Sequence, residues 1–122
     1  MEGIKFNENY NNKLNCEFFT TIRPKKEKYK VGEFFIMSCP GIQDFMAEII
    51  SVSEYPNLAS FSELELANDT GLDDYDKIVK LFESFYSNFD GPWYLIVLKR
   101  FDKKCVKCIE CGRKVRRTRC II

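Results

Sequence analysis

The sequence contains no histidine among its 122 residues, and this absence removes several classes of site at once. It excludes catalytic triads built on histidine, acid–base catalysis by imidazole, and histidine ligands to metal ions. A long apolar run is also missing, since no stretch approaches the roughly 20 residues that a membrane-spanning helix needs. The first 15 residues are polar and rich in asparagine, unlike a secretion signal. We therefore expect a cytoplasmic protein with no membrane partner.

Composition indicates one folded domain with an appended segment. Of the 122 residues, 45% are hydrophobic and 11 are phenylalanine, which is ample for a single core. Residues 103–122 contain eight basic residues and one acidic residue, a net charge of +7, which leaves −6 for the rest because the whole chain carries +1. We divide the chain into an N-terminal extension at 1–15, a domain at 16–102 and a basic, cysteine-rich tail at 103–122. Such a tail favours a polyanionic partner, or docking on its own acidic domain.

Three segments in the first half of the chain have the signals of β-strands. β-branched and aromatic residues fill 18–23 and stop at Pro24, which predicts a strand that leads into the basic loop 25–30. A second strand is expected from Phe34 to Cys39, because a glycine turn precedes it and Pro40-Gly41 follows it. A third is expected at 45–52. The last two are predicted to form an antiparallel hairpin.

Two helices and a final strand are expected in the second half. Ser60 and Glu63 have the spacing of a capping box, which predicts a short helix that ends before Gly71. Asp73 is the expected N-cap of a second helix, whose amphipathic pattern continues to about residue 86. Apolar residues on both faces of 93–101 indicate a central strand. Strands and helices grouped in this way predict an α+β fold with a curved, mostly antiparallel sheet.

The order of these segments resembles that of the ASCH family. The resemblance rests on FTTIR at 19–23, YKVGE at 29–33, AEI at 47–49, Thr70-Gly71 ahead of a helix that ends in FY at 85–86, and WYLIVL at 93–98. It covers roughly residues 16–101. It implies a small PUA-like β-barrel with two to three flanking helices, and a cleft that binds RNA or a nucleotide. The candidate ligand-binding residues are Thr20, Thr21, Arg23, Lys25, Lys26 and Thr70.

Arg23 is the first candidate on physical grounds as well. Strand alternation puts Thr21 and Arg23 on one face, where the hydroxyl offers a hydrogen bond and the guanidinium can bind a phosphate or base edge in bidentate fashion. Lysines in the loop that follows would add phosphate affinity without sequence choice. The alternative is that Arg23 pairs with a carboxylate and that these lysines are only solvated.

Some proteins similar to ASCH domains hydrolyse acetylated cytidine with a catalytic Lys, Thr and Glu. Alignment on Thr-Ile-Arg puts Thr21 at the nucleophile position, but Phe18 at the lysine position and Thr70 near the glutamate position. A threonine hydroxyl is a weak nucleophile without a base to take its proton. Substitutes would have to come from elsewhere in the chain, from Lys13, Lys25 or Asp69. The sequence therefore favours binding over catalysis, with Thr21 as the catalytic residue if the protein is an enzyme.

The tail carries four of the six cysteines in a pattern that suggests a metal site. Cys108, Cys111 and Gly112 have the C-x2-C-G form of a zinc knuckle, and Cys105 and Cys120 could complete a site of four thiolates. The expected zinc ligands are Cys105, Cys108, Cys111 and Cys120. Reduced cysteines without metal and an iron–sulfur cluster remain alternatives. Cys16 and Cys39 lie in apolar strand contexts and are expected in the core.

Three functions follow from these observations. The leading hypothesis is a non-catalytic ASCH-like module that binds RNA, another nucleic acid or a nucleotide. The second is an enzyme, an amidohydrolase on a modified nucleoside or a nuclease, that uses Thr21. The third is a small protein-interaction regulator of a phage or mobile-element kind, in which the tail binds a protein partner.

Overall fold

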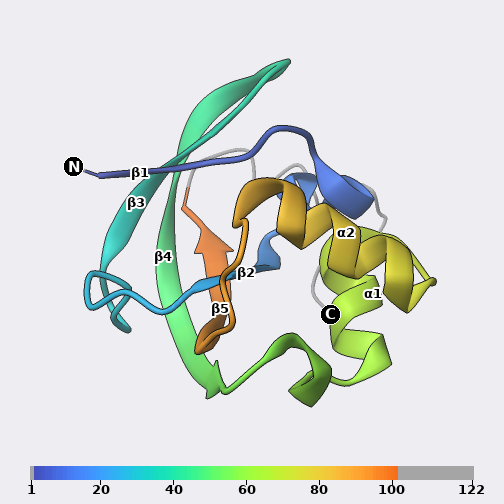
Figure 1. Ribbon diagram of the computed structural model, residues 1–122. Helices are drawn as coiled ribbons and strands as arrows, with labels where there is room; N and C mark the ends of the chain where they lie inside the picture. The colour runs from blue at the N-terminus through green and yellow to red at the C-terminus, as the bar shows by residue number, and fades with distance from the viewer. Residues whose placement is uncertain (1, 102–122) are drawn as a thin grey trace.

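A computed structural model of the chain describes residues 2–101, and these form one curled sheet with helices on one side (Figure 1). The elements in chain order are β1 (Gly3–Lys5), η1 (Tyr10–Asn15), β2 (Phe18–Pro24), β3 (Phe34–Cys39), β4 (Ile42–Tyr55), η2 (Leu58–Ser60), α1 (Glu63–Thr70), α2 (Tyr75–Phe85) and β5 (Trp93–Arg100), where η marks a 3-10 helix. The α+β class and the curved sheet are confirmed.

The sheet has five strands in the order β1-β3-β4-β5-β2, so β1 and β2 are its two edges. β1 runs parallel to β3, and the other three pairs are antiparallel. The predicted hairpin is present as β3 and β4, and the apolar strand β5 lies between β4 and β2. Because the sheet curls, its edges approach each other and leave the barrel open between β1 and β2 (Figure 1).

Two apolar clusters fill the two sides of the sheet. The inner cluster lies in the hollow of the curled sheet and includes Phe19, Phe45, Ile96 and Leu98. The outer cluster joins the sheet to α1 and α2, and Trp93 lies at its centre with Phe82 packed edge-on at 5.4 Å between ring centroids. Each strand contributes side chains to both clusters, because successive side chains along a strand point to opposite faces of the sheet.

The two helices begin later than the sequence pattern predicted. Ser62, not Ser60, caps α1: its hydroxyl accepts from the Glu65 N–H, and the Glu65 carboxylate accepts from the Ser62 N–H. Both serines have a glutamate three residues on, but Ser60 ends η2, and its hydroxyl donates to the side chain of Asn57. For α2 the N-cap is Asp74, which accepts from Asp76 N.

The first 15 residues belong to the fold itself. Ile4 is 1% exposed and lies in the inner cluster, and Leu14 is fully buried in the same cluster. The sequence pattern predicts an extension at 1–15, whereas in the structure this segment forms the edge strand β1 and the 3-10 helix η1.

No helix among residues 2–101 has the length and apolar character needed to cross a membrane.

Candidate functional site

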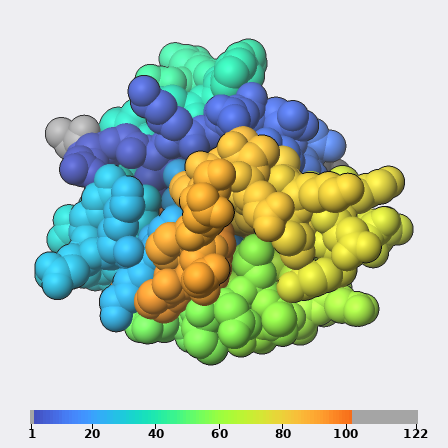
Figure 2. Space-filling model, in the orientation of Figure 1, coloured from blue at the N-terminus to red at the C-terminus, as the bar shows by residue number. Residues whose placement is uncertain are grey.

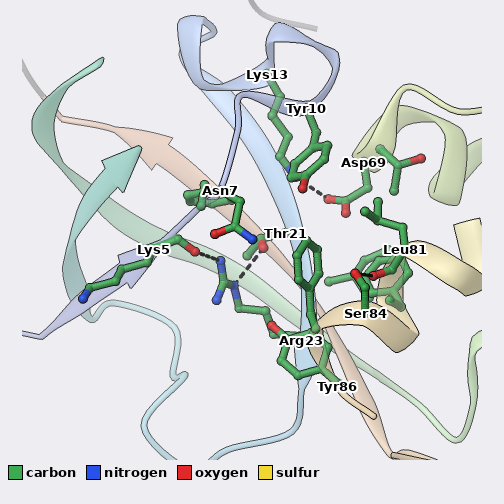
Figure 3. Close-up of a pocket in the computed structure, with 15 residues that line it drawn as sticks. Lys5, Asn7, Tyr10, Lys13, Thr21, Arg23, Asp69, Leu81, Ser84 and Tyr86 are labelled. Carbon is green, nitrogen blue, oxygen red and sulfur yellow. Dashed lines mark hydrogen bonds and ion pairs between the residues drawn. The ribbon is translucent and has the colours of Figure 1, made fainter. Parts of the chain in front are cut away.

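A cavity of about 330 Å³ lies over the free edge of β2, where the barrel is open. One wall is the segment that leaves β1, the other is the C-terminal half of α2, and η1 and the end of α1 close the deep end (Figure 3). Figure 2 shows the N-terminal segment, in dark blue, lying beside α2, in yellow and orange. The residues that line the cavity are Lys5, Phe6, Asn7, Tyr10, Lys13, Thr21, Ile22, Arg23, Asp69, Thr70, Leu81, Phe82, Ser84, Phe85 and Tyr86.

The contacts of η1 with the end of α1 fix the deep end. Asn11 donates from its side-chain amide to the Asn68 carbonyl at 3.0 Å. Gly71 caps α1 with a φ of 78°, and a Cβ added there would lie 3.2 Å from the Cβ of Asn11. The bare backbone at Gly71 therefore lets η1 approach closely, and this approach brings Lys13 to Asp69.

Lys13 and Asp69 form a buried ion pair inside the cavity. The Lys13 Nζ lies 2.8 Å from Asp69 Oδ1, and the two residues are 7% and 4% exposed. The Thr20 hydroxyl donates to the same oxygen at 2.7 Å. Burial lowers the pKa of Lys13 from its ordinary value, Asp69 opposes this shift, and the positive charge of Arg23 adds to it.

Lys13 and Asp69 have further hydrogen-bond donors and acceptors that no group in the described part of the chain satisfies. Within residues 2–101, Asp69 Oδ2 accepts no hydrogen bond, and Lys13 Nζ donates one of its three. Buried polar groups are normally paired, so unused capacity on two such groups in one cavity indicates a place for a polar ligand or water.

Arg23 spans the opening of the barrel. Its Nε donates to the Thr21 hydroxyl at 3.0 Å and its Nη2 to the Lys5 carbonyl at 2.8 Å, so one side chain links edge strand β2 to edge strand β1 (Figure 3). The guanidinium carbon lies 4.9 Å from the ring centroid of Phe6, and the Lys13 amine lies 5.4 Å from the same centroid. The ring of Phe6 therefore lies within cation–π distance of both Arg23 and Lys13.

The predicted ligand-binding residues divide into two groups. Thr21, Arg23 and Thr70 line the cavity, and Thr20 contacts it through Asp69. The Thr70 hydroxyl is already satisfied by backbone, since it donates to the Leu66 carbonyl and accepts from Leu72 N.

The basic loop lies apart from the cavity. Lys25 pairs with Glu54 at 3.2 Å on the surface, and neither Lys25 nor Lys26 lines the cavity. These two lysines are not brought together with Arg23 at the site.

The predicted zinc ligands Cys105, Cys108, Cys111 and Cys120 lie outside the described residues. No group of three or more Cys, Asp or Glu side chains within 2–101 is arranged to hold a metal ion.

No sequence pattern predicts the polar centre of the site. The sequence offers Lys13 and Asp69 only as substitutes for a missing catalytic base, and the structure places both in one cavity with Thr21. The one available signal was Asp69 directly before Thr70, near the end of an expected helix. Nothing in the local pattern joined it to Lys13, which is 56 residues away in the chain.

Comparisons of the chain with protein-family models, curated proteins and solved structures found no significant match.

Proposed function

We propose that the cavity over β2 binds one nucleotide unit, free or within an RNA strand, in the manner of a non-catalytic ASCH-like module. The observation that carries this proposal is the composition of the lining. Lys13 and Arg23 stand against one carboxylate, that of Asp69, so the lining has an excess of positive charge, whereas the Lys5 amine points away from the cavity (Figure 3). Its volume of about 330 Å³ suits a small ligand.

The arrangement offers separate contacts for the two parts of a nucleotide. Arg23 lies where the barrel is open, between β2 and the Lys5 carbonyl, and a phosphate bound there would keep part of its hydration. Aromatic side chains from the two walls, Phe6, Phe85 and Tyr86, provide faces on which a base can pack. The Lys13–Asp69 pair at the deep end supplies both donors and an acceptor for polar groups of the ligand.

Calorimetric titration of the full-length protein tests this proposal. The probes are the four ribonucleoside 5′-monophosphates and a mixed-sequence RNA hexanucleotide. Arg23→Gln should weaken binding by about tenfold or more, because a hydrogen bond to a charged group contributes about 1.5–3 kcal/mol. Lys25→Gln is the matched control, since Lys25 is paired with Glu54 outside the cavity. Absence of binding, or equal affinity for the wild type and the folded Arg23→Gln variant, would contradict the proposal.

A second function is hydrolysis of an acylated amine. It is supported by the position of Lys13, a possible base, in the same cavity as the Thr21 hydroxyl. The Thr21 hydroxyl accepts from Arg23, and its own hydrogen has no acceptor among residues 2–101. In its neutral form the Lys13 amine would take that proton as Thr21 Oγ1 attacks the acyl carbonyl. Lys13 would then return the proton to the leaving amine, and water would release the acyl group from Thr21. A pKa lowered by burial makes the neutral amine more accessible.

Turnover of N4-acetylcytidine decides between binding and hydrolysis. If the site is hydrolytic, wild-type protein releases acetate, and both Thr21→Val and Lys13→Arg lose this activity while remaining folded. Binding of the nucleoside without acetate release would eliminate the hydrolytic function and leave the binding function intact.

A further inference from the structure

The register of β2 shows which of its backbone groups point into the cavity. Arg100 N donates to the Glu17 carbonyl and Lys25 N to the Pro92 carbonyl, and the register between these two pairs is continuous. In an antiparallel ladder every second residue bonds to the neighbouring strand. The odd-numbered residues of β2 therefore bond to β5, and the N–H and C=O of Thr20 and Ile22 point away from it, toward the free edge.

Ile22 is the residue at which this free edge meets the cavity. Ile22 lines the cavity, and neither its N–H nor its C=O has a hydrogen-bond partner within residues 2–101. Ile22 as a whole residue is 2% exposed and its side chain packs in the outer cluster, so its N–H and C=O are buried at the wall of the cavity. A buried backbone donor and acceptor without partners are rare in folded proteins.

The open stretch of edge is short. Toward the start of β2, Thr20 lies against the Lys13–Asp69 pair, to which its hydroxyl is bonded. Toward the end, the Arg23 side chain crosses to the Lys5 carbonyl, and Pro24 has no N–H to offer. A peptide that adds as a strand needs several consecutive residues of free edge, so this site suits a small planar group instead.

The side chains on the two faces of β2 define the shape of that group. A flat ring bonded to the Ile22 backbone lies in the plane of the sheet, with its faces toward the two sets of side chains. Arg23 and Phe6 lie on one side, and Phe82 packs with Ile22 on the other. The ring would therefore lie between a cationic and aromatic layer and the aromatic side chains of α2.

We infer that the Ile22 N–H and C=O bind the base of the bound nucleotide along its Watson–Crick edge, with Asp69 and Lys13 contacting a further polar group of the base. Each nucleobase presents an adjacent donor and acceptor on this edge, which complements one backbone donor and one backbone acceptor. The inference rests on the proposed nucleotide function and adds the atoms that select the ligand.

Nucleosides methylated on this edge provide the first test. Full-length protein is titrated with uridine, guanosine and adenosine, and with 3-methyluridine, 1-methylguanosine and N6,N6-dimethyladenosine, which lack the donor adjacent to the edge acceptor. The 2′-O-methyl nucleosides are the controls. For each parent that binds, loss of the edge donor should weaken binding by about tenfold or more, because a buried acceptor is left unpaired. The 2′-O-methyl forms should retain most of the affinity.

A second test follows the Ile22 amide directly. In 15N-resolved NMR spectra, the Ile22 amide proton should move downfield and exchange more slowly when a binding nucleoside is added. Ile22→Pro removes this N–H without removing a ladder bond and should abolish binding. Phe18→Pro is the matched control, because its N–H points to the same edge outside the cavity. If Ile22→Pro does not fold, the amide signal and the methylated nucleosides decide.

The outcomes separate this inference from the proposed function. Equal affinity for parent and edge-methylated nucleosides, or an unmoved Ile22 amide in a saturated complex, would overturn recognition by the Ile22 backbone while nucleotide binding stands. Failure of every unmodified nucleoside and nucleotide to bind would overturn both.

Discussion

At the scale of single residues, the most informative feature is a buried ion pair. Lys13 and Asp69 are both buried, and taking two charges out of water offsets much of their attraction. In many proteins an apolar pair of similar volume replaces a buried ion pair without loss of stability. The pair makes sense as part of a binding site, where its unused donors and acceptor meet a ligand.

The titration of Lys13 tests its environment. Because burial dominates, its pKa in the folded protein should lie below the ordinary value of 10.5. Lys25 should titrate at higher pH than Lys13, because its hydrogen bond to Glu54 raises its pKa. The measurement is the NMR shift of each lysine side chain against pH. The free energy of unfolding should rise with pH between the lowered pKa of Lys13 and 10.5, because the unfolded chain binds more protons there.

Two substitutions should move the Lys13 pKa in opposite directions. Arg23→Gln removes a positive charge that lowers it, so the pKa should rise. Asp69→Asn removes the carboxylate that raises it, so the pKa should fall further. Shifts of the same sign in both variants would show that the pair does not lie in the cavity as described.

Part of the site was predictable at this scale. Strand alternation put Thr21 and Arg23 on one face, and both line the cavity. Lys13 was not predictable, because η1 has no periodic pattern: Asn11 and Asn12 adopt φ values of 57° and 53°, a left-handed conformation that asparagine tolerates. The residues against which such a turn packs are set by the tertiary structure.

At the scale of elements, β2, β3, β5 and the amphipathic α2 were predictable because their apolar periodicity and flanking turns agree. β1 was not, since its three residues are too few for a pattern and it pairs in parallel with a strand about 30 residues away. The start of α1 was ambiguous because two overlapping capping boxes fit the sequence, and only packing selects one.

Substitution of the two serines tests which box is used. Ser62→Ala should lower the free energy of unfolding by about 1 kcal/mol, since an N-cap hydroxyl that accepts a backbone N–H is removed. Ser60→Ala should have a far smaller effect, because its hydroxyl bonds only to an exposed asparagine side chain. The measurement is urea unfolding of both variants. A larger decrease from Ser60→Ala would place the helix start two residues earlier.

At the scale of the whole molecule, the chain combines an acidic body with a strongly basic tail. If the tail binds RNA phosphates, affinity should fall steeply with salt. Arg116→Gln/Arg117→Gln should make the slope of log affinity against log salt shallower by about 0.7 for each phosphate of single-stranded RNA that is no longer neutralised. Lys77→Gln/Lys80→Gln on α2, outside the cavity, is the charge-matched control and should leave the slope nearly unchanged. Equal slopes for both variants would assign the tail another partner.

Zinc binding by Cys105, Cys108, Cys111 and Cys120 stays a prediction of the sequence. Elemental analysis of purified protein should give one zinc per chain, and Cys108→Ser/Cys111→Ser should remove it. Full metal content in that variant would exclude these cysteines as ligands.

Chemical-shift mapping tests the central claim, that the cavity over the free edge of β2 is the ligand site. Uniformly 15N-labelled full-length protein is titrated with the ribonucleoside 5′-monophosphate that binds best, or with all four in turn. We expect the largest shifts at the amides of Ile22, Arg23 and the C-terminal half of α2, with Lys25 and Lys26 little affected. No shifts with any of the four, or shifts confined to the 25–30 loop or the 103–122 tail, would contradict this claim.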